Sequence, residues 1–201
     1  MKNYTVKKEN CDDIIVKNIY CIGRNYSEHA KELGNPKPKE PFFFQKSIPS
    51  LNTSQEIILP EDKSIDYEVE IVLLIGRDGT GKSLEDALSF IDGYAIGIDL
   101  TDREYQNSLK NKKLPWLLSK SFFGSAVVSD FSSRPIEDNF WLNLNGKRKQ
   151  QGSFEQMTFS YAEQIYFLSN KIPLMKGDLI FTGTPKGCLL YTSPSPRDPH
   201  L

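Results

Sequence analysis

The chain has 201 residues, enough for one domain with a sizeable core, and its 25 lysine and arginine residues almost balance 26 aspartate and glutamate residues. The resulting formal net charge of −1 excludes a global field that would attract nucleic acid or an anionic membrane, so a small-molecule partner is expected. No apolar run is long enough to span a bilayer, and the N-terminus lacks a signal peptide's apolar core. These features predict a soluble cytoplasmic protein, with the mitochondrion left open as the alternative.

Short strands and helices are predicted along the chain from apolar periodicity, capping residues and turn residues. In chain order the pattern predicts strands at 14–16 and 19–22, a helical turn at 27–33, extended segments at 42–44 and 56–60, a strand at 66–75, a helix at 83–90, a strand at 94–98, a helix at 101–109, a hairpin turn at 145–146, a helix at 160–170 and a strand at 178–182. Three helices begin with an N-cap hydroxyl followed three residues later by an acid: Ser83 with Asp86, Thr101 with Glu104, and Ser160 with Glu163.

Strands outnumber helices and do not alternate regularly with them, which predicts a mainly β, α+β domain rather than a doubly wound sheet. This domain is expected to cover residues 1–187. Residues 188–201 have no apolar periodicity and three prolines in the last eight positions, which predicts a disordered or foreign tail. The three cysteines are too far apart for a zinc site.

An acidic strand is the first candidate site. Asp66, Glu68 and Glu70 alternate with apolar residues and therefore share one strand face, where repulsion and lost hydration disfavour three carboxylates without a cation. Asp99 ends the next apolar strand. Oxygen ligands from Glu68, Glu70 and Asp99 suit an octahedral Mg²⁺ or Mn²⁺ ion with open positions. The competing interpretation is a solvated face on an edge strand, with Asp99 capping the helix that follows.

A histidine and a glutamate form the second candidate. His29 and Glu32 are spaced i, i+3, so on a helical turn they lie on one face, where the carboxylate orients the imidazole as a general base for water. A surface ion pair has the same spacing. His29 is the one histidine outside the predicted tail, so imidazole chemistry in this domain depends on it.

Further polar residues extend the predicted site. Arg103 and Gln106 share a helix face just after Asp99, where they offer donors to a substrate carboxylate, although a solvent-facing helix has the same pattern. Lys120 is a lone cation among apolar and aromatic residues, suited to a developing enolate or, alternatively, to an ordinary surface position. The turn at 183–187 offers backbone N–H groups and a hydroxyl to an anion or carbonyl oxygen.

Taken together, these segments resemble the fumarylacetoacetate hydrolase family, and most of all its small single-domain branch of acylpyruvate hydrolases and oxaloacetate decarboxylases. The resemblance runs in order from about residue 19 to 187. It rests on five motifs: Gly23-Arg24-Asn25-Tyr26 with His29 and Glu32; Asp66-Tyr67-Glu68-Val69-Glu70; Gly93-Tyr94 to Asp99-Leu100-Thr101 with Arg103 and Gln106; Lys120-Ser121-Phe122; and 177–185, Gly-Asp-Leu-Ile-Phe-Thr-Gly-Thr-Pro.

The resemblance implies a mixed β-sandwich roll, a homodimer and a bound Mg²⁺ or Mn²⁺ ion. Its implied site residues are metal ligands Glu68, Glu70 and Asp99; a water-activating dyad of His29 and Glu32; Lys120 beside the enolate; and substrate contacts Arg24, Arg103, Gln106 and Thr184. Family members continue after the turn at 183–187 into closing strands, whereas this chain begins its proline-rich tail there, so it looks truncated. Missing strands would leave unpaired edges and exposed apolar surface.

The leading expectation is a metal-dependent hydrolase that cleaves C–C bonds in 2,4-dioxo acids and releases pyruvate enolate. An oxaloacetate decarboxylase, or an isomerase or hydratase of a related 2-oxo acid, would use the same metal site and the same enolate. A metal- or ligand-binding protein without catalytic activity is the alternative from another class.

Overall fold

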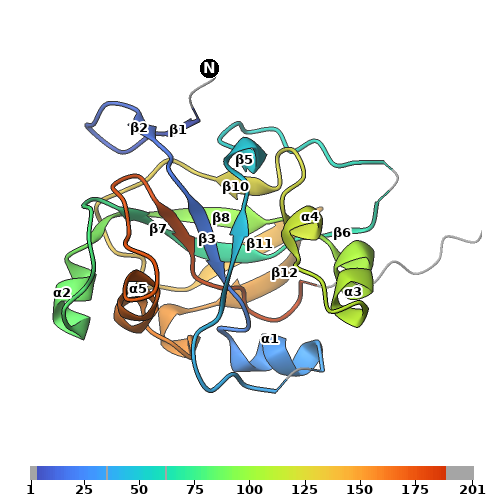
Figure 1. Cartoon of the computed structure of the whole chain (residues 1–201). Helices are drawn as coiled ribbons and strands as arrows, with labels where there is room; N and C mark the ends of the chain where they lie inside the picture. The colour runs from blue at the N-terminus through green and yellow to red at the C-terminus, as the bar shows by residue number, and fades with distance from the viewer. Residues whose placement is uncertain (1–3, 35, 62, 189–201) are drawn as a thin grey trace, which may run out of the picture.

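One large mixed β-sheet forms the centre of the molecule, in a computed structural model that describes residues 4–34, 36–61 and 63–188 (Figure 1). The strands are β1 Thr5–Val6, β2 Ile14–Ile15, β3 Ile19–Ile22, β4 Phe43–Lys46, β5 Leu51–Asn52, β6 Ile65–Asp66, β7 Val69–Ile75, β8 Ile91–Asp99, β9 Thr101–Asp102, β10 Ala126–Val128, β11 Phe140–Leu144, β12 Lys147–Gly152 and β13 Leu179–Phe181. The helices are α1 Ser27–Glu32, α2 Leu84–Leu88, α3 Arg103–Asn111, α4 Leu117–Lys120 and α5 Tyr161–Ser169, with 3₁₀ turns at Ile48–Ser50 and Phe154–Gln156. Within the described ranges, no helix has the length and apolar character needed to cross a membrane.

The sheet has the strand order β4-β3-β13-β7-β8-β10-β5. Strand β13 pairs with β3 in parallel and β10 pairs with β5 in parallel, while the other neighbours are antiparallel. Three two-stranded ribbons, β1-β2, β6-β9 and β11-β12, accompany it. Helices α2 and α5 pack together at one side of the sheet, and α3 and α4 lie at the opposite side (Figure 1). The mainly β, α+β class expected from the sequence is confirmed.

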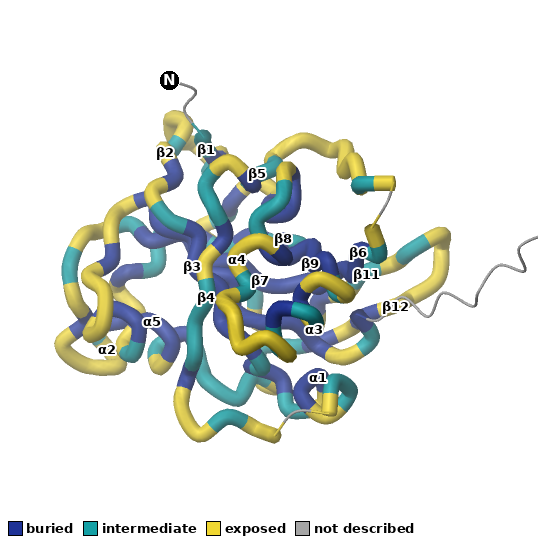
Figure 2. Tube along the Cα trace, turned by 45° about the vertical axis from the view of Figure 1, so that its right-hand side comes forward, coloured by how far each residue is buried: buried dark blue, intermediate teal, exposed yellow. Residues whose placement is uncertain are grey.

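Strand β7 separates two hydrophobic cores. All seven of its residues are buried, in the interior that Figure 2 shows beneath the exposed loops. Ile71 and Leu73 face the core shared with α5, whereas Val72 and Leu74 face the core shared with β3 and β10. A strand buried on both faces loses the polar alternation of a surface strand. Glu70 lies on the same strand face as Val72, so its side chain leaves the backbone inside the protein.

Local signals predicted several element ends correctly. Ser160 Oγ accepts the N–H of Glu163 at 3.3 Å, and a Glu163 carboxylate oxygen accepts the N–H of Ser160 at 2.8 Å, which completes the predicted capping box of α5. Asn145 and Gly146, with φ of 52° and 74°, make the predicted turn between β11 and β12. These interactions join residues at most three apart, so the sequence was sufficient to predict them.

The extended strand predicted at 56–60 is wrong. These residues belong to no strand, and Ile58 is 77 % exposed. Asn52 Nδ2 and Ser54 Oγ each donate to the carbonyl of Glu56 at 2.8 Å, which turns the chain immediately after β5. The sheet therefore ends at β5, which pairs with β10, and residues 56–60 leave the sheet instead of adding a strand to it.

Two boundaries near the predicted site also differ from the prediction. The strand expected at 66–75 is interrupted at 67–68, because β6 pairs with β9 while β7 pairs with β8. Helix α3 starts at Arg103 rather than Thr101, and its N-cap is Asp102, which accepts the N–H of Tyr105 at 3.1 Å. The hydroxyl of Thr101 instead accepts a hydrogen bond from Lys120 Nζ at 2.6 Å, so it does not cap the helix.

Candidate metal and active site

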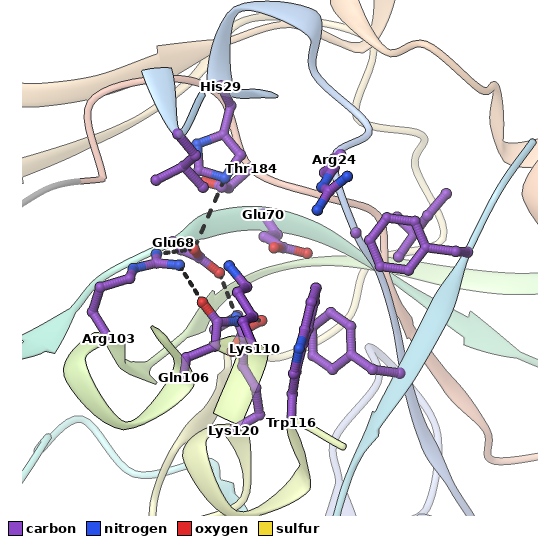
Figure 3. Close-up of a pocket in the computed structure, with 16 residues that line it drawn as sticks. Arg24, His29, Glu68, Glu70, Arg103, Gln106, Lys110, Trp116, Lys120 and Thr184 are labelled. Atoms are coloured by element: carbon purple, nitrogen blue, oxygen red, sulfur yellow. Dashed lines mark hydrogen bonds and ion pairs between the residues drawn. The ribbon is translucent and has the colours of Figure 1, made fainter. Parts of the chain in front are cut away.

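The three carboxylates predicted to hold a metal meet at one end of the sheet. Strands β7 and β8 are antiparallel, so the start of β7 lies beside the end of β8. The N–H of Asp99 donates to the carbonyl of Glu68 at 2.8 Å, which fixes their register. Ligand oxygens of Glu68, Glu70 and Asp99 all lie within 4.8 Å of one another. They face a cleft that encloses about 420 Å³, open solvent at its mouth included (Figure 3).

The three acids differ in how their charges are compensated. Glu68 is bonded by Lys120 at 2.6 Å and by Arg103 at 2.5 Å; burial alone would raise its pKa, but these cations hold it well below the usual range. Glu70 accepts the N–H of Gly183 at 2.8 Å and forms no ion pair with any described residue. Burial raises the pKa of Glu70 well above its usual range, and the charges of Asp99 and Glu68 raise it further.

Asp99 supplies an oxygen that also suits a metal ion. Its Oδ2 accepts a hydrogen bond from Lys120 at 2.7 Å. Its Oδ1 is buried and forms an ion pair with Lys46 Nζ at 2.7 Å. The ammonium group of Lys46 also donates to the carbonyls of Leu100 and Lys120 and to the hydroxyl of Ser125. The three converging carboxylates, of which Glu70 has no cationic partner among the described residues, fit a hard divalent cation such as Mg²⁺ or Mn²⁺.

The predicted His29 and Glu32 pair lies beside these carboxylates. His29 Nδ1 is 3.5 Å from a Glu32 oxygen, and its Nε2 is 3.9 Å from Glu68 Oε1. Glu32 also accepts the N–H of Gly187 at 3.0 and 3.1 Å. The hydrogen bond with His29 lowers the pKa of the Glu32 carboxyl, against the effect of partial burial. The imidazole therefore has one nitrogen toward an ionised carboxylate and the other toward the cleft.

The arginine expected to bind a substrate carboxylate is hydrogen-bonded to other side chains of the protein instead. Arg103 Nε donates to Asp66 at 2.7 Å. Its Nη2 donates to Glu68 at 2.5 Å and its Nη1 to the Gln106 side-chain oxygen at 2.7 Å (Figure 3). The helix spacing did bring Arg103 and Gln106 together. However, Asp66 is 3 % exposed and supports the guanidinium rather than lying in solvent. Because Arg103 bonds the side-chain oxygen of Gln106, the amide NH₂ group of Gln106 is the donor that this interaction leaves unused.

The turn at 183–187 orients Glu70 and Glu32 rather than presenting a free set of anion donors. The N–H of Gly183 bonds Glu70, and that of Gly187 bonds Glu32. Thr184 lines the cleft, but its hydroxyl donates its proton to the carbonyl of Val69 at 2.8 Å. The hydroxyl also accepts a hydrogen bond from Gln150 Nε2 at 2.8 Å, so it has no free proton and at most one lone pair left for a ligand.

Two lysines of the site were missed by the sequence analysis. Lys46, at the end of β4, is 2 % exposed and packs beneath Asp99. It is a single cation just after the aromatic run at 42–44, as Lys120 is a lone cation among apolar and aromatic residues, and this was the available signal. Lys110 lines the cleft one turn beyond Gln106 on α3. Its i+7 spacing from Arg103 places it on the same helix face, so this residue was predictable.

Comparison with known families agrees with this geometry. The family model for the fumarylacetoacetate (FAA) hydrolase C-terminal domain matches residues 18–199. The chain belongs to the fumarylacetoacetate hydrolase family. The predicted 188–201 tail lies outside the described residues except for Cys188, which is buried with its Sγ 3.6 Å from His29 Nδ1.

Curated members of this family include similar proteins from several eukaryotes. The chain is 39 % identical over 179 residues to the mitochondrial oxaloacetate decarboxylase of Dictyostelium discoideum, covering 85 % of this chain and 82 % of that protein. It is 39 % identical over 180 residues to the mitochondrial oxaloacetate tautomerase FAHD1 of Rattus norvegicus, covering 85 % and 80 %. The predicted cytoplasmic location is contradicted by these relatives, which are mitochondrial. The charge balance and N-terminal composition on which it rested do not separate the two compartments.

A solved structure confirms the expected family fold. The fumarylpyruvate hydrolase of Pseudomonas aeruginosa, in complex with Mn²⁺ and pyruvate, superimposes with a TM-score of 0.87 at 32 % identity, covering 93 % of this chain and 86 % of that one. The relatives thus include decarboxylase, tautomerase and hydrolase activities. Family membership establishes an enzyme family, while the choice among these reactions depends on the site.

Proposed function

We propose that this chain is a Mg²⁺- or Mn²⁺-dependent enzyme that forms the enolate of a 2-oxo acid, with oxaloacetate as its preferred substrate. The observation that carries the proposal is the cluster of Glu68, Glu70 and Asp99, buried within 4.8 Å of one another, in which Glu70 forms no ion pair with any described residue. A divalent ion held there would supply Lewis-acid polarisation of the 2-oxo acid. The similarity to oxaloacetate decarboxylase and tautomerase supports the choice of substrate.

The protein's own residues supply the charge and the proton transfer. Lys120 Nζ is fixed by hydrogen bonds of 2.6–2.7 Å to Glu68, Asp99 and Thr101. Its positive charge would stabilise the negative charge that develops on the enolate oxygen. His29, oriented by Glu32, has Nε2 toward the cleft, where it removes or returns a proton at the carbon next to the carbonyl. Tautomerisation of oxaloacetate needs these two functions, and decarboxylation needs the same enolate stabilisation.

Hydrolysis of a 2,4-dioxo acid is the second candidate. The His29 and Glu32 pair favours it, since the same imidazole would take a proton from water as the water attacks the 4-carbonyl. The similarity to fumarylpyruvate hydrolase supports this alternative. A metal-binding protein without turnover is the third outcome to be tested.

A substrate panel at equal metal concentration separates these reactions. Enol–keto conversion of oxaloacetate is followed by ultraviolet absorbance, its decarboxylation by pyruvate formation, and acetylpyruvate cleavage by pyruvate release, each with Mn²⁺, Mg²⁺ or a chelator. We expect metal-dependent turnover of oxaloacetate to exceed that of acetylpyruvate. Faster acetylpyruvate cleavage would favour the hydrolase, and no turnover by folded, Mn²⁺-binding protein would refute the proposal.

Two further properties belong to the same proposal. A mitochondrial location follows from the relatives named above. A homodimer, implied by the family resemblance, stays a prediction that light scattering of the purified chain tests.

A further inference from the structure

Four cationic side chains line the cleft, and two of them have no anionic partner among the described residues. Lys120 and Arg103 are each bonded to buried carboxylates at 2.5–2.7 Å. The side chains of Arg24 and Lys110 form neither a hydrogen bond nor an ion pair with any residue in the part of the chain that the structure describes. Lys120 and Arg103 direct their donors to protein oxygens, so the cations with unfilled donors for a further anion are Arg24 and Lys110.

An aromatic cluster holds these two cations. Lys110 Nζ lies 4.9 Å from the ring centroid of Trp116, and Arg24 Cζ lies 5.5 Å from that of Phe42. The two rings contact each other edge to face, with centroids 5.8 Å apart. Cations over ring faces are oriented without being neutralised. The pair is therefore placed by one continuous apolar surface and keeps its charge for another partner.

The backbone directs both cations to the same space. Arg24 follows β3 with φ of +58°, a left-handed conformation that is uncommon for a residue with a side chain and is found where surrounding structure requires it. Lys110 approaches from the opposite wall, on the face of α3 that carries Arg103 and Gln106. Figure 3 shows both side chains pointing into the cleft in front of Glu70.

The charge of the cleft favours an additional anion. Its lining has four cations and three carboxylates, before any divalent ion is added. Burial, together with the neighbouring charges of Arg103 and Arg24, lowers the pKa of Lys110 to about 8. The neighbouring cations therefore repel Lys110, and a bound anion would relieve this repulsion.

We propose that Arg24 and Lys110 form a second anion site, which binds the remote carboxylate of a dicarboxylic 2-oxo acid whose 2-oxo acid end lies at Glu68, Glu70 and Asp99. The inference rests on the proposed function and names its substrate class: 2-oxo acids with a second carboxylate are selected over monocarboxylic 2-oxo acids of the same length. Charge-assisted hydrogen bonds from two cations make this selection strong.

Calorimetric binding of two inert ligands in the presence of Mn²⁺ tests the site. The ligands 2-oxoglutarate and 2-oxopentanoate have chains of equal length and differ in the remote carboxylate. We expect the wild-type chain to bind 2-oxoglutarate at least about tenfold more tightly. Lys110→Gln and Arg24→Asn should each reduce this ratio several-fold, and the double variant should bring it near one; asparagine is chosen because it tolerates the left-handed backbone.

The control is Lys112→Gln, an exposed lysine two residues further along that does not line the cleft; its ratio should equal that of wild type. Thermal unfolding of every variant verifies that it is folded. A wild-type ratio near one, a variant effect equal for both ligands, or no binding of either ligand would overturn the inference. Turnover of oxaloacetate with a ratio near one would leave the proposed function intact, whereas a selective ratio without turnover would refute only that function.

Discussion

Replacing Glu70 by glutamine should leave the metal-free protein at least as stable as wild type while removing its stabilisation by a divalent ion. Glu70 is 2 % exposed, lies among two other carboxylates and forms no ion pair with a described residue. The hydrogen bond that its carboxylate accepts from the N–H of Gly183, at 2.8 Å, is also available to the carbonyl oxygen of glutamine. The substitution thus removes buried charge repulsion together with a metal ligand.

The size of the effect follows from linkage. A metal at one hundred times its Kd adds about 2.7 kcal/mol to the free energy of unfolding. For a domain of 150–250 residues, 1 kcal/mol corresponds to about 2–4 °C in Tm, so Mn²⁺ should raise the wild-type Tm by roughly 5–11 °C. The Glu70→Gln variant should gain only a small part of this.

Glu68→Gln is the matched control, two residues away and equally buried. Glu68 bonds Lys120 at 2.6 Å and Arg103 at 2.5 Å, so neutralising it leaves buried cations uncompensated and should cost about 3 kcal/mol without metal. Its folded-state pKa is depressed. The stability it contributes is therefore present above the unfolded carboxyl pKa and lost as the pH falls, which predicts that wild type and Glu68→Gln converge in stability at acidic pH.

Thermal unfolding followed by circular dichroism at pH 7, with and without Mn²⁺, measures both variants. The reasoning would be refuted if metal-free Glu70→Gln lost as much stability as Glu68→Gln. It would also be refuted if Glu70→Gln kept the full Mn²⁺ shift, since Glu70 would then not be a ligand.

Three further predictions concern the supporting residues. Lys46→Met should cost about 3 kcal/mol in urea unfolding, because it removes a buried cation 2.7 Å from Asp99; an unchanged midpoint would contradict this. The preference for 2-oxoglutarate should fall between pH 7 and 9, because Lys110, with a pKa of about 8, loses its charge as the pH rises; calorimetry at both pH values checks it, and a rising preference would be inconsistent. Gly23→Ala places a Cβ 2.1 Å from the Phe42 ring, so the ring must be displaced. This displacement should lower Tm and weaken 2-oxoglutarate binding. An unchanged thermal unfolding curve would mean that the ring moves freely and would contradict the prediction.

Interactions between near neighbours were predictable from the sequence, whereas competition from distant residues was not. Ser160 caps α5 as its spacing with Glu163 predicts. Thr101 has the same spacing with Glu104 but does not cap α3, because its hydroxyl is bonded to Lys120, nineteen positions away. A capping pattern fixes a helix start only when no tertiary partner takes the hydroxyl, and a single sequence does not reveal such partners.

The metal-site acids were predictable for a different reason. Carboxylates in a strand as buried as β7 conflict with its apolar core, so their presence indicates a function that compensates the cost. The compensation itself was not visible in the sequence. Lys46 reaches Asp99 from β4, and Asp66 reaches Arg103 across a break in the predicted strand, through pairings that depend on the folded sheet.

The position of substrate recognition follows from this competition for cations. Helix spacing correctly groups Arg103 with Gln106, which share a hydrogen bond of 2.7 Å, but the guanidinium is committed to Asp66 and Glu68. The same helix face continues one turn further to Lys110, where no carboxylate competes within the described chain. Because a bound anion needs a cation with unfilled donors, the remote end of the substrate should be read at Lys110, while Arg103 maintains the charge and orientation of the metal-site acids.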